Sequence, residues 1–184
     1  FKSIKTQDIR DHIFQILDKE GIDYENEAVE IIARRAEGGM RDALSILDQA
    51  LSLTQEGALT TAVSEEITGT ISLAALDHYV AALAQKDTTS ALDNLNLIFD
   101  NGKSMTRFVT DLLQYLRDIL IVQTGGENTH YSEIFKENLS LSQDMLFEMI
   151  SIATKSLSDI KASLQPKIYA EMMTIRLAEL EVKP

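Results

Sequence analysis

Apolar residues recur along the whole chain at spacings of three and four, which is the period of an amphipathic helix. No stretch shows sustained alternation of apolar and polar residues, so strands are not expected. Prolines, which interrupt helices, occur only at Pro166 and Pro184 among 184 residues. The pattern therefore predicts an all-α protein.

Three short helices are predicted in the first third of the chain, over residues 6–21, 24–37 and 40–53. Thr6 is the expected cap of the first helix, and the pair Gly38 and Gly39 separates the second helix from the third. The inward faces are expected to carry Ile9, Ile13, Ile16 and Leu17; Ala28, Ile32 and Ala36; and Met40, Leu44, Leu47 and Leu51.

A domain boundary is expected in residues 54–61, which contain Gly57. We therefore predict a first domain over residues 1–57 and a second over residues 58–184.

The second domain is predicted to be a bundle of about five longer helices. Ser72, Ser104 and Ser142 are expected N-caps, because a serine side chain can accept a hydrogen bond from the first turn. Pro166 suits the first turn of a last helix that ends near Glu181. Residues 125–139 are rich in Gly, Asn and Glu, and a loop is expected there.

The last helix is apolar around most of its circumference. Its expected polar strip consists of Lys167, Glu171, Thr174 and Glu181. Such a helix is either central in its own bundle or shared with another subunit, and the pattern leaves both interpretations open. For a shared helix, the expected interface residues are Ile168, Met172, Met173 and Leu177.

The formal net charge is −12, and no basic cluster occurs apart from Arg34 and Arg35. Proteins that grip nucleic acid need clustered cations to neutralise phosphates, so no direct nucleic-acid binding is expected. The chain has no cysteine, no long apolar run and no signal-peptide pattern, which predicts a cytoplasmic protein without a membrane span. Because the first residue is Phe1, we expect an excised piece of a longer protein.

The motifs of a complete active site are missing from the sequence. There is no G-x-x-x-x-G-K-[ST] phosphate loop, no H-E-x-x-H and no G-x-S-x-G. The histidines at 12, 78 and 130 are far apart, so no metal site is expected. No catalytic residue is assigned, and whether the chain belongs to an enzyme stays open at this point.

Arg41 stands out because it lies in the first turn of a predicted helix, directly after two glycines. The positive end of the helix dipole disfavours a cation there by about 0.3–1 kcal/mol. A guanidinium beside exposed backbone N–H groups is suited to bind an anion such as a phosphate. The alternative is an ordinary surface arginine that Asp42 partly neutralises.

Residues 37–50, EGGMRDALSILDQA, closely resemble the sensor 2 helix of the gamma/tau clamp-loader subunits of bacterial DNA polymerase III, which belong to the AAA+ ATPases. The resemblance covers essentially the whole chain. It is carried also by residues 1–2, 6–9 and 67–180, with 101–104 and 108–120 the most similar parts of the last range.

The resemblance implies that residues 1–57 are a three-helix AAA+ lid domain and that residues 58–184 are a helical collar domain for oligomerisation. It implies that Arg41 contacts the terminal phosphate of ATP, held with Mg²⁺ mainly by an ATPase domain outside this sequence. Met40 and Ile4 would line the base and sugar, and Gly39 would allow a close backbone approach. The parent would be an ATPase subunit of a DNA-directed DNA polymerase.

The partners implied by the resemblance are the other clamp-loader subunits: delta, delta-prime and further gamma/tau copies. Contacts with the sliding clamp and with primed DNA would come through the whole complex. The alternative hypothesis is a free-standing helical adaptor that binds a partner through its last helix.

Overall fold

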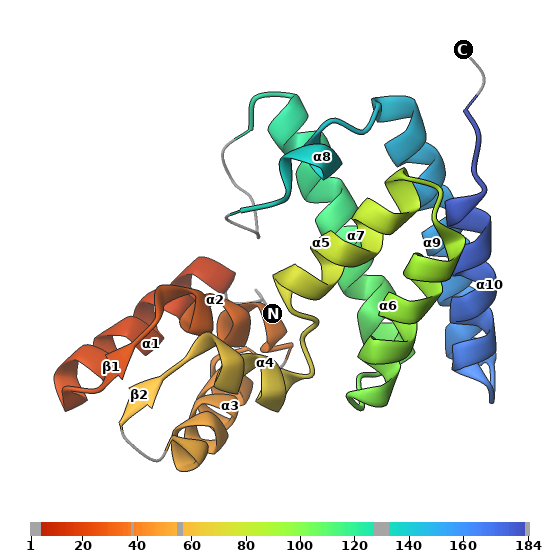
Figure 1. The fold of residues 1–184 in the computed structure, drawn as a ribbon. Coiled ribbons are helices and arrows are strands. Elements are labelled where there is room, and N and C mark those ends of the chain that lie inside the picture. Colours follow the sequence, from red (N-terminus) through yellow and green to blue (C-terminus); the bar gives the residue numbers. More distant parts are fainter. Residues whose placement is uncertain (1–4, 38, 55–56, 127–132, 183–184) are drawn as a thin grey trace. The chain divides into compact units, whose positions relative to one another are not determined.

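The computed structural model describes residues 5–37, 39–54, 57–126 and 133–182 (Figure 1). These residues are mainly helical, with only two very short strands among them, which confirms the predicted all-α fold class. The chain divides into two compact units between Thr70 and Ile71, and each unit is described by itself.

Unit 1 (residues 1–70) packs four helices around one core in its described part. They are α1 (Thr6–Glu20), α2 (Asn26–Arg35), α3 (Met40–Leu53) and α4 (Thr61–Thr68). The core is built from aliphatic and alanine side chains: Ile9, Ile13, Leu17, Ala28, Val29, Ile32, Ala33, Ala36, Ala43, Leu47, Ala50 and Leu59. Because alanines alternate with larger residues, the helices can approach closely.

The N-cap of the first helix lies one residue earlier than predicted. Lys5 occupies the N-cap position without a side-chain hydrogen bond, and Thr6 is the first helical residue, so the Thr6 cap was wrong. The end near Gly21 is confirmed, since Gly21 has the left-handed backbone conformation, with φ of 68°, that ends helices.

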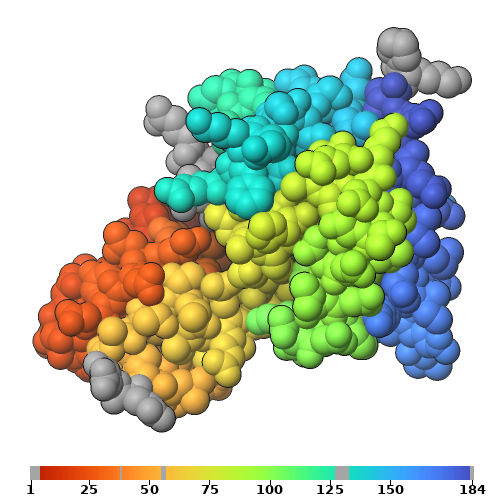
Figure 2. All heavy atoms as spheres, viewed as in Figure 1, coloured from red at the N-terminus to blue at the C-terminus, as the bar shows by residue number. Residues whose placement is uncertain are grey.

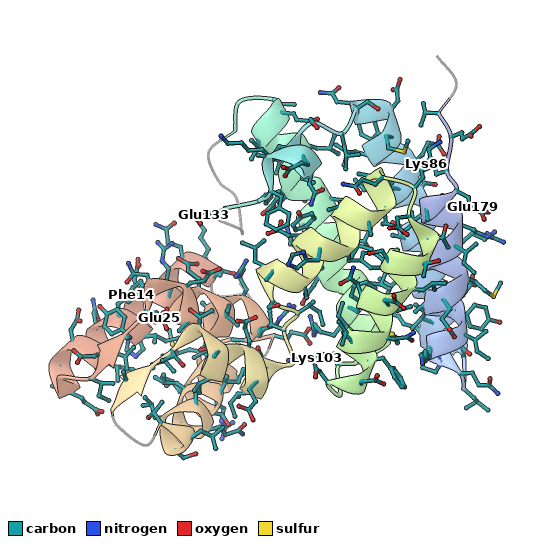
Figure 3. The ribbon with its side chains drawn as sticks, viewed as in Figure 1. Phe14, Glu25, Lys86, Lys103, Glu133 and Glu179 are labelled. Carbon is teal, nitrogen blue, oxygen red and sulfur yellow. The ribbon has the colours of Figure 1, made fainter. Side chains whose placement is uncertain are left out.

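Two very short strands contradict the expectation that none would form. β1 (Asp23–Tyr24) pairs in parallel with β2 (Ala58–Leu59). Tyr24, predicted as the start of a helix, is instead held by a 2.9 Å hydrogen bond from its hydroxyl to Asp18. This bond to a carboxylate raises the pKa of Tyr24. Its ring also packs 5.3 Å from that of Phe14, which lies near Glu25 in Figure 3.

α4 belongs to unit 1 by packing, because it lies against α2 and α3. Glu25, just before α2, accepts a 3.2 Å hydrogen bond from the Thr61 amide at the start of α4. The predicted domain boundary after residue 57 precedes α4, whereas the compact units divide after Thr70. Residues 58–70 are thus connected to unit 1 by contacts that sequence patterns do not reveal.

Unit 2 (residues 71–184) is a helical bundle. Its described helices are α5 (Leu73–Ala84), α6 (Thr88–Asp100), α7 (Met105–Gln123), α8 (Lys136–Leu139), α9 (Gln143–Ala162) and α10 (Pro166–Ala178). Neighbours around the bundle are α7, α9, α10, α6 and α5 in that order, and α8 contacts both α5 and α7 (Figure 1). α10 also contacts α5 and α7, which places one of its faces in the middle of the bundle.

The three predicted serine caps of unit 2 are confirmed. Ser72, Ser104 and Ser142 each accept a hydrogen bond from the backbone amide three residues later, at 3.2, 3.3 and 3.1 Å. Pro166 lies in the first turn of α10, as predicted, although the helix ends at Ala178 rather than near Glu181.

The second half of the expected loop at 125–139 is ordered by a buried polar network. Asn138 in α8 is fully buried, and its side-chain amide donates to the Tyr115 hydroxyl at 2.7 Å and to the Asp77 carbonyl at 3.0 Å. Tyr115 in turn donates to the Asp77 carboxylate at 2.5 Å, and the Phe135 amide donates to the same oxygen at 3.2 Å. These bonds attach α8 to α5 and α7. Residues 127–132 of the expected loop lie outside the described residues.

Thr174 was predicted on the polar strip of the last helix, and the structure corrects this placement. Its side chain is fully buried, and it donates a 2.7 Å hydrogen bond to the Ala170 carbonyl. Since that bond uses its one hydroxyl hydrogen, the 2.7 Å contact with Tyr79 must be donated by the tyrosine. Burial raises the pKa of Tyr79.

Among the described residues, no single helix has the length and apolarity needed to cross a membrane. Within this part of the chain, only α4 and α5 together, as a bent pair, have the required length and apolarity.

We predict that Thr174→Val lowers the free energy of unfolding of unit 2 by about 1–3 kcal/mol, because Tyr79 would keep a buried hydroxyl without its acceptor. Thr110→Val is the matched control. Thr110 also donates to the carbonyl four residues earlier, at 2.8 Å, but is only partly buried. Its substitution is expected to change the free energy by less than about 0.5 kcal/mol. Urea denaturation followed by circular dichroism measures both, and equal losses would contradict the assignment.

Candidate functional site

The turn between α2 and α3 depends on the backbone conformation of Gly39. After α2 ends at Arg35, the Gly39 amide donates to the Ala36 carbonyl at 3.1 Å. Gly39 has φ of 80° and ψ of −149°, a region that residues with a side chain rarely adopt. No atom lies within 4 Å of a Cβ added at this position. The requirement for glycine is therefore conformational and not a matter of space.

Gly39 occupies the N-cap position of α3, and no side chain accepts a capping hydrogen bond there. The first helical hydrogen bond runs from the Ala43 amide to the Gly39 carbonyl at 3.0 Å. The amides in the first turn of a helix have no acceptor within the helix, so they point outward with the positive end of the helix dipole. Asp42 is the acidic residue of this first turn. Its carboxylate partly offsets the helix dipole, so an anion at the start of α3 would be held by the outward-facing amides together with the Arg41 cation.

Arg41 is exposed and makes no hydrogen bond or ion pair with any residue that the structure describes. Its direction follows from the packing of α3, which buries Ala43, Leu47 and Ala50 at positions i, i+4 and i+7. At 100° per residue, Arg41 lies about 160° from Ala43 around the helix, on the face opposite the core. Its guanidinium is therefore available to a ligand or partner outside unit 1.

The other predicted site residues of unit 1 are placed only in part. Met40 is partly buried and packs against the unit 1 core beside Arg41. Ile4 lies outside the described residues. The structure therefore places three of the predicted residues, Gly39, Met40 and Arg41, at the start of α3, and their role remains a prediction.

The three other arginines of unit 1 donate hydrogen bonds to residues of the same unit. Arg10 donates to Glu30 at 2.9 Å, and this hydrogen bond raises the pKa of Arg10. Arg34 donates through Nε to the Glu30 carbonyl at 3.3 Å. Arg35 donates through Nε to the Thr70 hydroxyl at 3.0 Å, a contact that the sequence analysis missed. No local signal could have identified it, because the two residues are 35 positions apart.

A second candidate site is an exposed apolar stripe on α10, formed by Ile168, Met172 and Ile175. Their exposed fractions are 47%, 45% and 39%. They follow the i, i+4, i+7 spacing of one helix face, and the exposed Glu179 continues this face toward the C-terminus (Figure 3). Figure 2 shows α10, in blue, beside α6, in green.

The structure separates the four predicted interface residues into two faces. Ile168 and Met172 lie on the α10 stripe, whereas Met173 and Leu177 are only 1% and 2% exposed and belong to the core of unit 2. On α6, Phe99 is 40% exposed and lies under the Lys167 ammonium, which is 4.7 Å from the ring centroid. This cation–π contact joins α6 to the margin of the stripe.

No group of three metal-ligating side chains comes together within the described part of the chain. A hollow lined by Met145, Met149 and Leu177, among other residues, has a volume of about 30 Å³. This leaves room only for water and is far too small for a nucleotide.

Comparison with known families identifies both parts of the chain. Residues 8–56 match the family described as "DNA polymerase III clamp loader subunit, ATPase lid domain". Residues 59–184 match the family described as "DNA polymerase III subunits gamma and tau domain III".

Curated relatives agree with the family matches. The DNA polymerase III subunit tau of Bacillus subtilis (strain 168) is 33% identical over 186 residues, which cover 97% of this chain and 33% of that protein. The subunit gamma/tau of Mycobacterium tuberculosis (strain ATCC 25618 / H37Rv) is 22% identical over 96% of this chain and 32% of that protein. The chain thus spans about a third of the length of these relatives.

Among solved structures, the Bacillus subtilis DNA clamp loader delta protein (YqeN) is similar, with a TM-score of 0.49 and 11% sequence identity. The match covers 98% of this chain and 58% of that chain.

We predict that Arg41 contributes little to folding. Arg41→Ala is expected to change the free energy of unfolding by less than about 0.5 kcal/mol, because the side chain is exposed and has no partner among the described residues. Gly39→Ala should cost about 1–3 kcal/mol, because alanine is strained at a φ of 80°. Urea denaturation measures both values. A large loss for Arg41→Ala would show that the side chain is held for structural reasons.

Proposed function

Because the chain belongs to the family of DNA polymerase III gamma and tau subunits, we propose that residues 1–57 act as the lid of a clamp-loader ATPase and residues 58–184 as its collar. In this role the lid senses the nucleotide, and the collar joins subunits into the complex that loads the sliding clamp during DNA replication. The complete subunit is expected in the bacterial cytoplasm. The single observation that carries the sensing role is the exposed Arg41 at the uncapped start of α3.

The residues at this site fit the terminal phosphate of ATP. A guanidinium offers several N–H donors in one plane, and the open helix start adds backbone N–H groups and a positive dipole. Arg41 would contact the phosphate, Gly39 would allow close backbone approach, and Met40 and Ile4 would line the base and sugar. ATP would supply the phosphate that distinguishes the two nucleotide states, and residues outside this chain would hold the rest of it with Mg²⁺.

The sensing role requires that Arg41 contact one nucleotide state and not the other. A ligand changes a conformational equilibrium only through its differential affinity for the two states. A hydrogen bond to a charged group contributes about 1.5–3 kcal/mol, which corresponds to roughly a 10- to 100-fold shift. This contact is therefore strong enough to bias the orientation of a lid.

We predict that Arg41→Ala in the full-length subunit abolishes ATP-dependent clamp loading and weakens ATP binding about 10- to 100-fold, while subunit assembly is intact. Arg107→Ala is the matched control, since Arg107 also lies in the first turn of a helix, α7, but in unit 2. Nucleotide binding, clamp loading and light scattering measure the three properties. Normal loading by Arg41→Ala, or an equal defect in Arg107→Ala, would remove Arg41 from the mechanism.

For assembly, the α10 stripe is the surface that supports the proposal. Its apolar side chains are spaced as anchors that a partner helix or groove can bury. The proposed partners are the other clamp-loader subunits: further gamma/tau copies, delta and delta-prime. With a net charge of −12, the chain is expected to meet the sliding clamp and primed DNA only through the whole complex.

The same stripe would also serve a free-standing helical adaptor, which is the second candidate function. The adaptor needs no nucleotide, so an ATP affinity that is unaffected by Arg41→Ala would favour it.

We predict that the adjacent methionines Met172 and Met173 respond differently to a charge. Met172→Lys should leave the full-length subunit folded and weaken its self-association, because Met172 is 45% exposed on the stripe. Met173→Lys should unfold unit 2, because a lysine would be buried in the core without a partner.

Circular dichroism and light scattering at rising concentration distinguish these outcomes. A strict monomer for the unsubstituted protein, or full association of Met172→Lys, would contradict the assembly role of the stripe.

A further inference from the structure

A chain of hydrogen bonds joins the C-terminal end of α2 to the last residue of unit 1. Arg35 Nε lies 3.0 Å from the Thr70 hydroxyl, which lies 2.7 Å from the Thr68 hydroxyl. Thr68 then donates to the Ser64 carbonyl at 2.7 Å. This series of hydrogen bonds thus connects α2, α4 and the residue that precedes unit 2.

The donor and the acceptor of each hydrogen bond in this series can be assigned. Thr68 has one hydroxyl hydrogen and donates it to Ser64, so Thr70 must donate to Thr68. Arg35 can only donate, so Thr70 accepts from it. The series begins at the Arg35 cation, and each hydroxyl accepts from the group before it and donates to the group after it. The hydrogen bonds therefore polarise and strengthen one another. Thr70 is only 7% exposed, so water competes little for its hydroxyl.

Thr70 occupies the point where the chain leaves unit 1. Its own amide donates to the Glu65 carbonyl at 3.1 Å, so both its backbone and its side chain are held within unit 1. The next residue, Ile71, donates its amide to the Asp111 carboxylate of unit 2 at 2.9 Å in a buried hydrogen bond. Residues 70 and 71 are therefore each held by their own unit.

Arg35 is the last residue of α2 and directly precedes the turn that leads to Gly39 and Arg41. A displacement of this turn therefore acts on Arg35. The cation is also well placed in α2, because positive charge is favourable in the last turn of a helix.

We propose that Arg35 and Thr70 are a pair of positioning residues that couple the start of α3 to the exit of the chain from unit 1. Through this pair, a movement of the sensing turn reaches residue 70 and the backbone that enters unit 2. The inference rests on the proposed nucleotide-sensing function and adds to it the residues that transmit the change.

Thr70 is the better residue to substitute. Thr70→Val keeps the shape of the side chain and removes both hydroxyl hydrogen bonds. Arg35 has interactions beyond the bond to Thr70, so its substitution would remove more than one contact. Thr70→Ser restores the hydroxyl, and Thr110→Val on α7 is the control for an equivalent exchange elsewhere.

The experiment uses the full-length subunit in its reconstituted complex. We expect Thr70→Val to bind ATP within about two-fold of the unsubstituted protein, because the pair does not touch the nucleotide. Clamp loading should fall by about ten-fold, the factor expected for one hydrogen bond to a charged group. Amide hydrogen exchange at residues 68–72 should depend on nucleotide in the unsubstituted protein and lose that dependence in Thr70→Val. Thr70→Ser should restore both loading and the nucleotide dependence of exchange.

Three results would overturn the coupling. The first is amide exchange at residues 68–72 that does not depend on nucleotide in the unsubstituted protein. The others are normal clamp loading by Thr70→Val and failure of Thr70→Ser to restore clamp loading. An Arg41→Ala arm separates this inference from the proposed function. If Arg41→Ala weakens ATP binding while Thr70→Val behaves normally, only the coupling fails. If Arg41→Ala binds ATP normally, the sensing function itself fails.

Discussion

The rotation of α3 about its own axis is the constraint on which the candidate sensing site depends. Burial of Ala43, Leu47 and Ala50 fixes this rotation, and the positive φ of Gly39 fixes where the helix starts. Together they place Arg41 at the first turn and on the face opposite the core. A shift of the buried positions by one residue along α3 would rotate the guanidinium by about 100° about the helix axis. The core of unit 1 therefore sets the direction of the charge that the proposed function requires.

Local signals in the sequence predicted well wherever the deciding interaction is itself local. The bounds of α3 and the caps at Ser72, Ser104 and Ser142 were correct, because each depends on hydrogen bonds within three or four residues. Interactions over long distances in the sequence were missed. The pairing of β1 with β2 and the attachment of α4 to unit 1 depend on contacts between segments that no local pattern records.

α10 shows why the exposed face of the proposed assembly helix could not be predicted from the sequence. Its apolar residues occupy almost every side, so their pattern contains no preferred direction. The neighbouring helices settle the rotation: Ala170, Thr174 and Ala178, which are small, face the bundle and allow close packing. Met173 and Leu177 fill the remaining core, which leaves Ile168 and Met172 outside. Sequence reasoning singled out this helix and left both alternatives open, and the face that lies outside the bundle follows only from the contacts with α5, α6, α7 and α9.

The energy available at Arg41 links the two proposed roles of the chain. Moving a two-state equilibrium from 1:99 to 99:1 requires about 5.5 kcal/mol of differential binding. One charge-assisted contact supplies about 1.5–3 kcal/mol, which biases a single lid without fully switching it. Several lids joined through their collars can add their contributions, provided that each lid transmits its state along its own chain. On this proposal, assembly through the α10 stripe and transmission through Arg35 and Thr70 belong to the same switch, since one charge-assisted contact alone does not provide enough energy.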